Sequence, residues 1–94
     1  MTLIWSPTAL ADLKHIRTYI AEHNPAAANE IVETVRAAVH RLEQFPFVGR
    51  VGRVSDTREL VIAGTPYVVP YRVRGTGIEI VAVMHGAQQW PDVF

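Results

Sequence analysis

Two glycine-containing dipeptides in the second half of the chain, Gly64-Thr65 and Gly75-Thr76, constrain its fold most. Each separates apolar segments rich in β-branched and aromatic residues. Glycine in the first position of a two-residue loop meets the demand of a type II′ turn, the usual connection of a β-hairpin. The sequence therefore predicts a three-stranded antiparallel meander, with strands at about residues 57–62, 67–74 and 78–85.

The two turns also predict a register, with Ile62 opposite Tyr67 and Val73 opposite Ile78, and this register sorts the side chains onto two faces. One face is almost wholly apolar and must be buried; it holds Leu60, Ile62, Tyr67, Val69, Tyr71, Val73, Ile78, Ile80, Ala82 and Met84. The other face is mixed and predicted to be open; it holds Thr57, Glu59, Val61, Val68, Pro70, Arg72, Arg74, Glu79, Val81, Val83 and His85. Because proline cannot donate a ladder hydrogen bond, Pro70 predicts a local irregularity.

Two cap-plus-proline pairs, Ser6-Pro7 and Asn24-Pro25, predict the starts of two helices in the first half of the chain. The first helix should end near His23 and the second at Pro46. The expected apolar stripes are Leu10, Leu13, Ile16 and Ile20 on the first helix, and Ile31, Val35, Ala38, Leu42 and Phe45 on the second. The heptad-like spacing of the second stripe suits either an intramolecular hairpin or a coiled-coil dimer. So tight a turn between two short helices favours the hairpin.

The predicted fold class is therefore α+β. A short N-terminal strand (Leu3, Ile4 and Trp5) precedes an antiparallel helical hairpin, a loop over residues 46–56, and a three-stranded antiparallel meander packed on the hairpin. At 94 residues the chain is expected to form one domain, 1–94.

Charge and composition limit the classes of function. Nine basic residues balance nine acidic ones, whereas proteins that bind nucleic acid through phosphates usually carry a basic excess. The chain has no cysteine, no long apolar run and no signal-peptide pattern, so we expect a cytoplasmic protein. The four histidines are scattered, and neither a metal site nor a cofactor is predicted.

Three residues of the mixed face are candidates for chemistry. His85 could act as a general acid or base, but no second such group is clearly placed beside it, which favours a structural hydrogen bond. Arg72 could stabilise a phosphorane-like transition state, although a cross-strand ion pair with Glu79 is the simpler use. Glu59 could be a base; a solvated strand residue is the preferred interpretation.

Other residues are candidates for binding a partner. Arg50 and Arg53 each follow a glycine that would let the loop present both guanidinium groups to carboxylates or phosphates, unless one of them caps a helix. Arg58 falls on the apolar face, which predicts a structural ion pair, for example with a helix acid. The predicted partner-binding set is Arg50, Arg53, Arg72, Arg74, His85 and Trp90, with Trp90 and Phe94 forming an apolar tail.

In order and spacing, several short motifs resemble the ParE/RelE toxins of type II toxin–antitoxin modules. They are Trp5-Ser6-Pro7 with Ala9, Asp12 and Leu13; Ile20 with Asn24-Pro25; Phe45-Pro46 with the loop Gly49-Arg50-Val51-Gly52-Arg53; Arg58-Glu59-Leu60; Tyr71-Arg72-Val73; and His85-Gly86 with Trp90-Pro91. The resemblance implies a toxin that is masked by a cognate antitoxin, a hetero-oligomeric complex and an association with plasmid stabilisation.

Within this family, the resemblance offers two activities. RelE-like members cut mRNA on the ribosome and carry several basic residues on the sheet, whereas ParE-like members poison DNA gyrase. This chain has one lysine, Lys14, and no tyrosine after Tyr71, which favours the ParE-like branch. On this interpretation the toxin inhibits gyrase by protein binding, with no catalytic residue and no strong nucleic-acid binding. The alternatives are a ribosome-dependent endoribonuclease using His85, Arg72 and Glu59, or a degenerate toxin that only binds its antitoxin.

Overall fold

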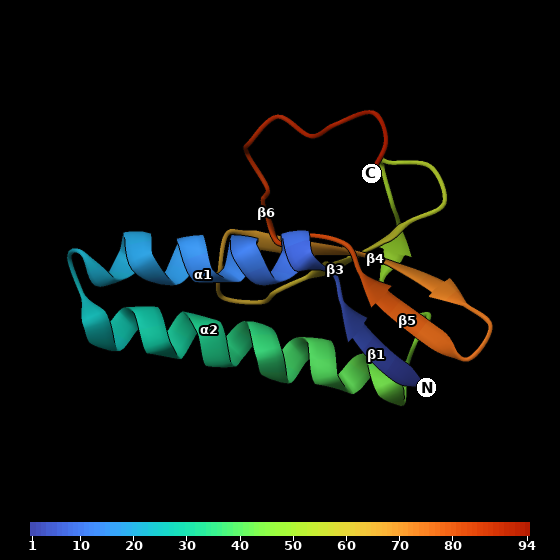
Figure 1. The fold of residues 1–94 in the computed structure, drawn as a ribbon, viewed down its shortest axis with the longest axis horizontal. Coiled ribbons are helices and arrows are strands. Elements are labelled where there is room, and N and C mark those ends of the chain that lie inside the picture. The colour runs from blue at the N-terminus through green and yellow to red at the C-terminus, as the bar shows by residue number, and fades with distance from the viewer.

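A computed structural model describes residues 1–94 and has the predicted α+β architecture, with two helices on one face of a mixed sheet (Figure 1). Neither helix combines the length and apolar character needed to cross a bilayer. The elements in chain order are β1 (Thr2–Trp5), α1 (Pro7–Ala21), α2 (Pro25–His40), the 3-10 turn η1 (Arg41–Glu43), β2 (Arg50–Val51), β3 (Arg58–Val61), β4 (Tyr67–Arg74), β5 (Gly77–Ile80) and β6 (Met84–His85).

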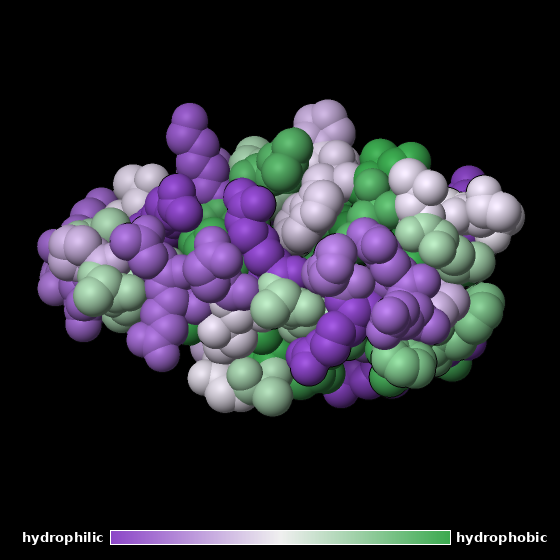
Figure 2. All heavy atoms as spheres, turned by 90° about the horizontal axis from the view of Figure 1, so that it is seen from below, coloured by the Kyte–Doolittle hydropathy of each residue, from purple (hydrophilic) through white to green (hydrophobic).

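Both helices begin where the sequence predicts. The Ser6 hydroxyl accepts a hydrogen bond from the Ala9 N–H, and the Asn24 side chain accepts one from the Ala27 N–H. The helices form the predicted hairpin within one chain, so Ile31, Val35, Ala38 and Leu42 of the second apolar stripe pack inside the molecule rather than in a coiled coil. The face that shows the α2 side is mostly hydrophilic, with apolar atoms in small separate patches (Figure 2).

The predicted end of the second helix was wrong. α2 ends at His40, and η1 changes the helical period before the chain reaches Phe45. Phe45 is consequently exposed rather than part of the helical seam. Leu10 of the first stripe is also half exposed.

The predicted register of the meander is confirmed. Arg72 lies opposite Glu79 between β4 and β5, and the β3–β4 pairing has the predicted alignment. Two strands add to the meander: β1 pairs in parallel with β5, and β2, inside the predicted loop, pairs with β3. The first turn differs in detail, because the Thr65 N–H donates to the Ile62 carbonyl and Gly64 (φ 78°) takes the third turn position.

The last predicted strand is interrupted by a β-bulge. The Val81 N–H still donates to the Pro70 carbonyl in the predicted register, but Met84 then pairs with Val68, one residue out of step. Ala82 and Val83 thus oppose the single residue Val69. β4 itself runs unbroken through Pro70, so the irregularity predicted at this residue lies instead on the neighbouring strand.

Side chains of α1 and its cap satisfy backbone groups of the bulge. The Ser6 hydroxyl donates to the Val81 carbonyl at 2.8 Å, and Asp12 Oδ2 accepts from the Val83 N–H at 2.9 Å. Because buried backbone groups without partners are costly, these contacts fix the bulge against the helix.

The bulge changes the predicted faces beyond Ile80. The predicted apolar residues from Leu60 to Ile80 do pack against the helices, but Val83 replaces Ala82 and Met84 in this main core. Ala82 and Met84 instead join Val81 in a second apolar cluster, against which Trp90 and Phe94 pack.

The face predicted to be open is therefore largely covered. The C-terminal tail and the loop after β2 extend on the same side of the sheet (Figure 1), and Val68, Pro70, Thr57 and Glu59 are buried.

Candidate functional site

The loop arginines converge on one buried carboxylate, that of Glu59. Glu59 lies on β3 beside β2 and is only 1% exposed, so its interpretation as a solvated strand residue was wrong. Arg50 donates to Glu59 Oε1 from Nε and Nη2, at 3.0 and 2.8 Å. Arg53 donates to both carboxylate oxygens from its side chain, and its backbone N–H donates to Oε2 at 2.7 Å.

The electrostatics of this cluster favour an ionised Glu59. Burial by itself would raise the pKa of Glu59, but hydrogen bonds from the side chain and backbone of Arg53 and from Arg50 outweigh burial and lower the pKa below its ordinary value of 4.5. A carboxylate held in this state and enclosed by cations is poorly suited to act as a base. The side chains of Arg50 and Arg53 remain 55% and 42% exposed, so their outer surfaces can still contact a partner.

The rest of the loop is anchored to the sheet through Tyr71. Its hydroxyl accepts from the Gly49 N–H and donates to the Pro46 carbonyl, both at 2.9 Å. A Cβ at Gly49 would lie 2.5 Å from this hydroxyl, so the glycine permits close packing rather than a sharp turn. Arg58 does not form the predicted ion pair; it donates to the Phe47 and Gly49 carbonyls and lies over the Phe47 ring.

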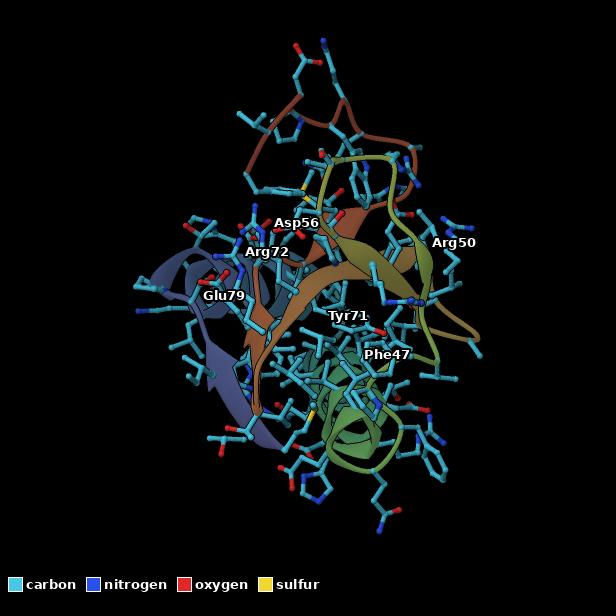
Figure 3. All side chains as sticks on the ribbon, turned by 90° about the vertical axis from the view of Figure 1, so that its right-hand side faces the viewer. Phe47, Arg50, Asp56, Tyr71, Arg72 and Glu79 are labelled. Carbon is cyan, nitrogen blue, oxygen red and sulfur yellow. The ribbon has the colours of Figure 1, made fainter.

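Arg72 and Arg74 form a second charged cluster, shown for Arg72 in Figure 3, where its side chain lies between Asp56 and Glu79. Arg72 contacts Glu79 at 3.2 Å as predicted, lies 3.8 Å from Asp56, and also donates to the Phe94 carbonyl. Arg74 pairs with Asp56 at 2.8 Å. Asp56 reaches both arginines from a backbone with φ of 62°, a conformation that asparagine and aspartate tolerate better than most residues.

His85 does not lie on the face of these arginines, and this prediction was wrong. The bulge turns His85 toward α1, where its ring contacts Tyr67 edge to face at 5.8 Å. Its Nδ1 accepts from the Ala87 N–H, which agrees with the structural role favoured by the sequence. The set His85, Arg72 and Glu59 is therefore not brought together as one catalytic group.

Trp90 belongs to the covering tail. Its ring lies 3.8 Å from the Arg53 guanidinium carbon, and its indole N–H donates to the His85 carbonyl. The tail thus joins the Glu59 cluster to the end of the sheet. Trp90 is half-buried against the second apolar cluster, so only part of it is available to a partner.

Two surface features were not identified from the sequence. The first is a run of exposed apolar side chains between η1 and the Glu59 cluster, formed by Phe45, Phe47, Val48 and Val51. Val51 is 81% exposed although it lies on a strand. The concentration of apolar residues in this short stretch is a signal in the sequence that could have indicated an exposed apolar surface within the predicted loop.

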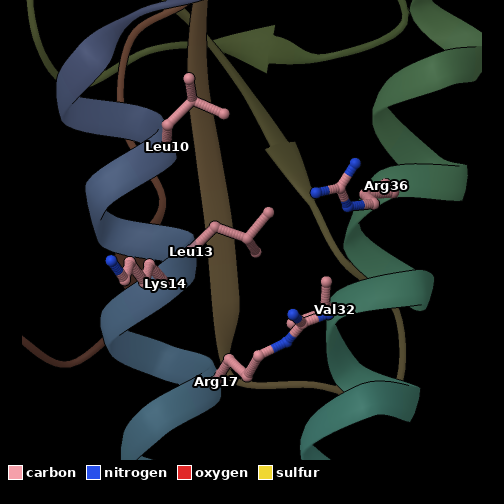
Figure 4. A pocket seen from close by; sticks show the side chains of 6 residues that line it. All are labelled: Leu10, Leu13, Lys14, Arg17, Val32 and Arg36. Carbon is pink, nitrogen blue, oxygen red and sulfur yellow. The ribbon is translucent and has the colours of Figure 1, made fainter.

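The second is a basic groove between the two helices. Leu10 and Leu13 of α1 and Val32 of α2 form its apolar part, and the side chains of Arg17 and Arg36 extend into the space between the helices (Figure 4). Lys14 completes the lining, and none of the three cations takes part in a salt bridge.

Comparison with known proteins agrees with this architecture. Residues 3–90 match the family of the ParE toxin of the type II toxin–antitoxin system parDE. The chain is 45% identical to the putative toxin Y4kP of Sinorhizobium fredii over 95% of this chain and 92% of the relative. It is 36% identical to the toxin RelE2 of Caulobacter vibrioides over 92% and 96% of the two chains.

Among solved structures, a chain of the chromosomal ParDE toxin–antitoxin system from P. aeruginosa superposes with a TM-score of 0.82 at 31% identity. The match covers 90% of this chain and 95% of the other. The names of the relatives include both ParE and RelE, so they identify the family without selecting one activity. Fold, sequence and domain length agree, and the chain belongs to the ParE toxin family of type II toxin–antitoxin systems.

Proposed function

We propose that this toxin inhibits DNA gyrase by binding it as a protein, with no catalytic step of its own. The main support for the proposal is that the charged groups on this face of the sheet are already paired with one another. Glu59 is enclosed by Arg50 and Arg53, Arg72 contacts two carboxylates, and His85 lies on the opposite face. Cleavage of RNA requires a general acid and a general base aligned on one phosphodiester. Because the charged groups of this face are already paired with one another, the face is better suited to contact a protein than to cleave RNA.

The surface best suited to the target is the apolar loop of Phe45, Phe47, Val48 and Val51. Contiguous exposed apolar side chains commonly mark protein interfaces. The half-exposed guanidinium groups of Arg50 and Arg53 lie at the end of this loop. Arginine and aromatic residues are enriched among the side chains that dominate binding energy.

The cognate antitoxin is proposed to bind across the helical hairpin, with its acidic residues facing the basic groove. Lys14, Arg17 and Arg36 have no carboxylate partner within the chain and flank an apolar floor. An amphipathic segment with an apolar stripe and acidic flanks fits such a groove. A stable complex would bury more than about 1,000 Å² in total.

The test is a gyrase supercoiling assay with purified toxin, alongside an mRNA integrity assay in a translating extract. We expect supercoiling to be inhibited and mRNA to remain intact, and we expect induced cells to show a DNA-damage response. Val51→Asp should abolish inhibition without loss of thermal stability because its side chain is exposed. Val61→Asp, exposed elsewhere on β3, is the matched control and should leave inhibition unchanged.

His85→Gln separates the two activities of the family. On the gyrase proposal it should leave growth inhibition intact, because Gln can still accept the Ala87 N–H. A general acid or base contributes about 10²- to 10⁴-fold in rate, so the same change should disable a ribonuclease. Ribosome-dependent mRNA cleavage that is lost in His85→Gln would contradict the gyrase proposal and identify a ribonuclease. If both assays show no activity while antitoxin binding persists, the chain is a degenerate toxin.

A further inference from the structure

The largest hollow of the molecule, about 420 Å³, lies between the outer side of α1 and the end of the sheet formed by β4 and β6. It plays no part in the surfaces described above. Its size is within the range of about 300–1,000 Å³ that is typical of ligand pockets. The polar and aromatic residues that line it are Asp12, His15, Tyr19, Tyr67, His85 and Gln88.

The negative charge of Asp12 favours a cationic ligand in this hollow. Asp12 is the only acidic residue in the lining, and no lysine or arginine lines the hollow. Asp12 Oδ2 is held by the Val83 N–H at 2.9 Å, which fixes the carboxylate, while Oδ1 makes no hydrogen bond within the chain. An anionic ligand would meet this carboxylate with no lysine or arginine beside it, whereas a cationic ligand would be attracted to it.

The walls of the hollow are aromatic. Tyr67 and His85 contact each other edge to face, and Tyr19, 68% exposed on α1, lies at the rim. Cations bind favourably over aromatic faces, and a planar guanidinium can stack on a ring while its N–H groups bind a carboxylate. A lysine ammonium is a compact, strongly hydrated point charge and would use this combination less well.

We infer that this aromatic hollow receives an arginine side chain of a protein partner. The inference rests on the proposed function only in assuming that the toxin works through protein contacts. The position on α1 gives a further reason. Lys14 and Arg17 direct positive charge to the basic groove, while Asp12 gives the hollow the opposite sign. A partner segment that crosses α1 would therefore bring acids to one side and an arginine to the other.

The test is an NMR titration of ¹⁵N-labelled, full-length toxin with the capped peptide Ala-Arg-Ala and its citrulline counterpart. Citrulline keeps the shape of arginine but lacks the charge. The arginine peptide should shift the amide resonances of residues around the hollow and bind about tenfold more tightly than the citrulline peptide. Absence of saturable shifts, shifts located elsewhere, or equal binding of the two peptides would refute the site.

Two variants keep this test independent of folding. Asp12→Asn retains an acceptor for the Val83 N–H and should weaken arginine binding about tenfold, and Tyr19→Ala removes an exposed ring and should weaken it about fivefold. Arg41→Ala, an exposed change outside both the basic groove and the hollow, should leave the affinity unchanged. Arginine binding that survives Asp12→Asn overturns the inference. The titration uses no gyrase, so its failure and a failed supercoiling assay are separate results.

Discussion

At the level of single residues, the Glu59 cluster is asymmetric, because the carboxylate of Glu59 is buried whereas the side chains of Arg50 and Arg53 are half exposed. Removing the two arginines leaves a buried negative charge without a partner. Removing the carboxylate leaves two positive charges that water can solvate. We expect Arg50→Ala/Arg53→Ala to lower the free energy of unfolding by about 3–5 kcal/mol. Glu59→Gln should cost about 1–3 kcal/mol.

A triple variant checks this explanation by chemical denaturation. Adding Glu59→Gln to the double arginine variant removes the stranded charge, so the triple variant should be more stable than the double variant. A triple variant that is less stable than the double variant would show that the cost arises from lost packing instead.

The pH dependence of stability follows from the same cluster. The folded-state pKa of Glu59 is lowered, so its ionised form contributes stability that is complete well above the ordinary pKa of 4.5 and is lost as pH falls through the lower folded value. Melting temperatures of the natural chain and Glu59→Gln should therefore differ by a constant amount near neutrality. The difference should narrow below about pH 4.5. A gap that stays constant into stronger acid would contradict the lowered pKa.

The sequence predicts the side-chain partners of some charged residues but not of others. Arg72 and Glu79 were paired correctly because two turns determine which positions face each other across adjacent strands. The partner of Arg50 and Arg53 was missed because it depends on β2, a two-residue strand whose pairing with β3 has no periodicity to detect. Once β2 is known, Arg50 lies opposite Glu59 and the contact follows.

At the scale of elements, the loop before β2 depends on one hydroxyl. Tyr71→Phe leaves the buried Gly49 N–H and the part-buried Pro46 carbonyl without their partner. We expect a loss of about 1–3 kcal/mol in the free energy of unfolding. Tyr19→Phe removes the same atom from an exposed ring and should change stability by less than about 0.5 kcal/mol. Equal effects in the two variants would mean that Tyr71 does not anchor the loop.

Most helices and strands were predictable because their signals are local. Capping side chains start both helices, and glycine turns fix the meander. The bulge was only partly predictable. Pro70 indicated an irregularity, but its consequences depend on Ser6 and Asp12, which are more than 70 residues away in the chain.

At the level of the complete domain, the basic groove and the aromatic hollow lie on two sides of α1 and predict how a partner is oriented across this helix. Charge reversal of the basic groove, as Arg17→Glu/Arg36→Glu, should weaken binding of an antitoxin with acidic flanks by at least about tenfold. Isothermal titration with the cognate antitoxin measures this. Arg41→Glu, an exposed change outside the groove, serves as the control. Equal affinity of the groove variant and the natural chain for the antitoxin would show that the antitoxin binds another surface.

The bulge also has a consequence for how such a toxin could diverge. Loss of one codon between Val81 and Val83 would restore the uninterrupted register, in which residues alternate faces up to the strand end. His85 would stay opposite Tyr67 and beside α1, because the deletion only removes the extra residue that the bulge accommodates. The bulge thus takes up one residue of chain length without changing the surface toward which the following side chains point. Homologues that are one residue shorter at this point should therefore keep the imidazole on the same side of the sheet.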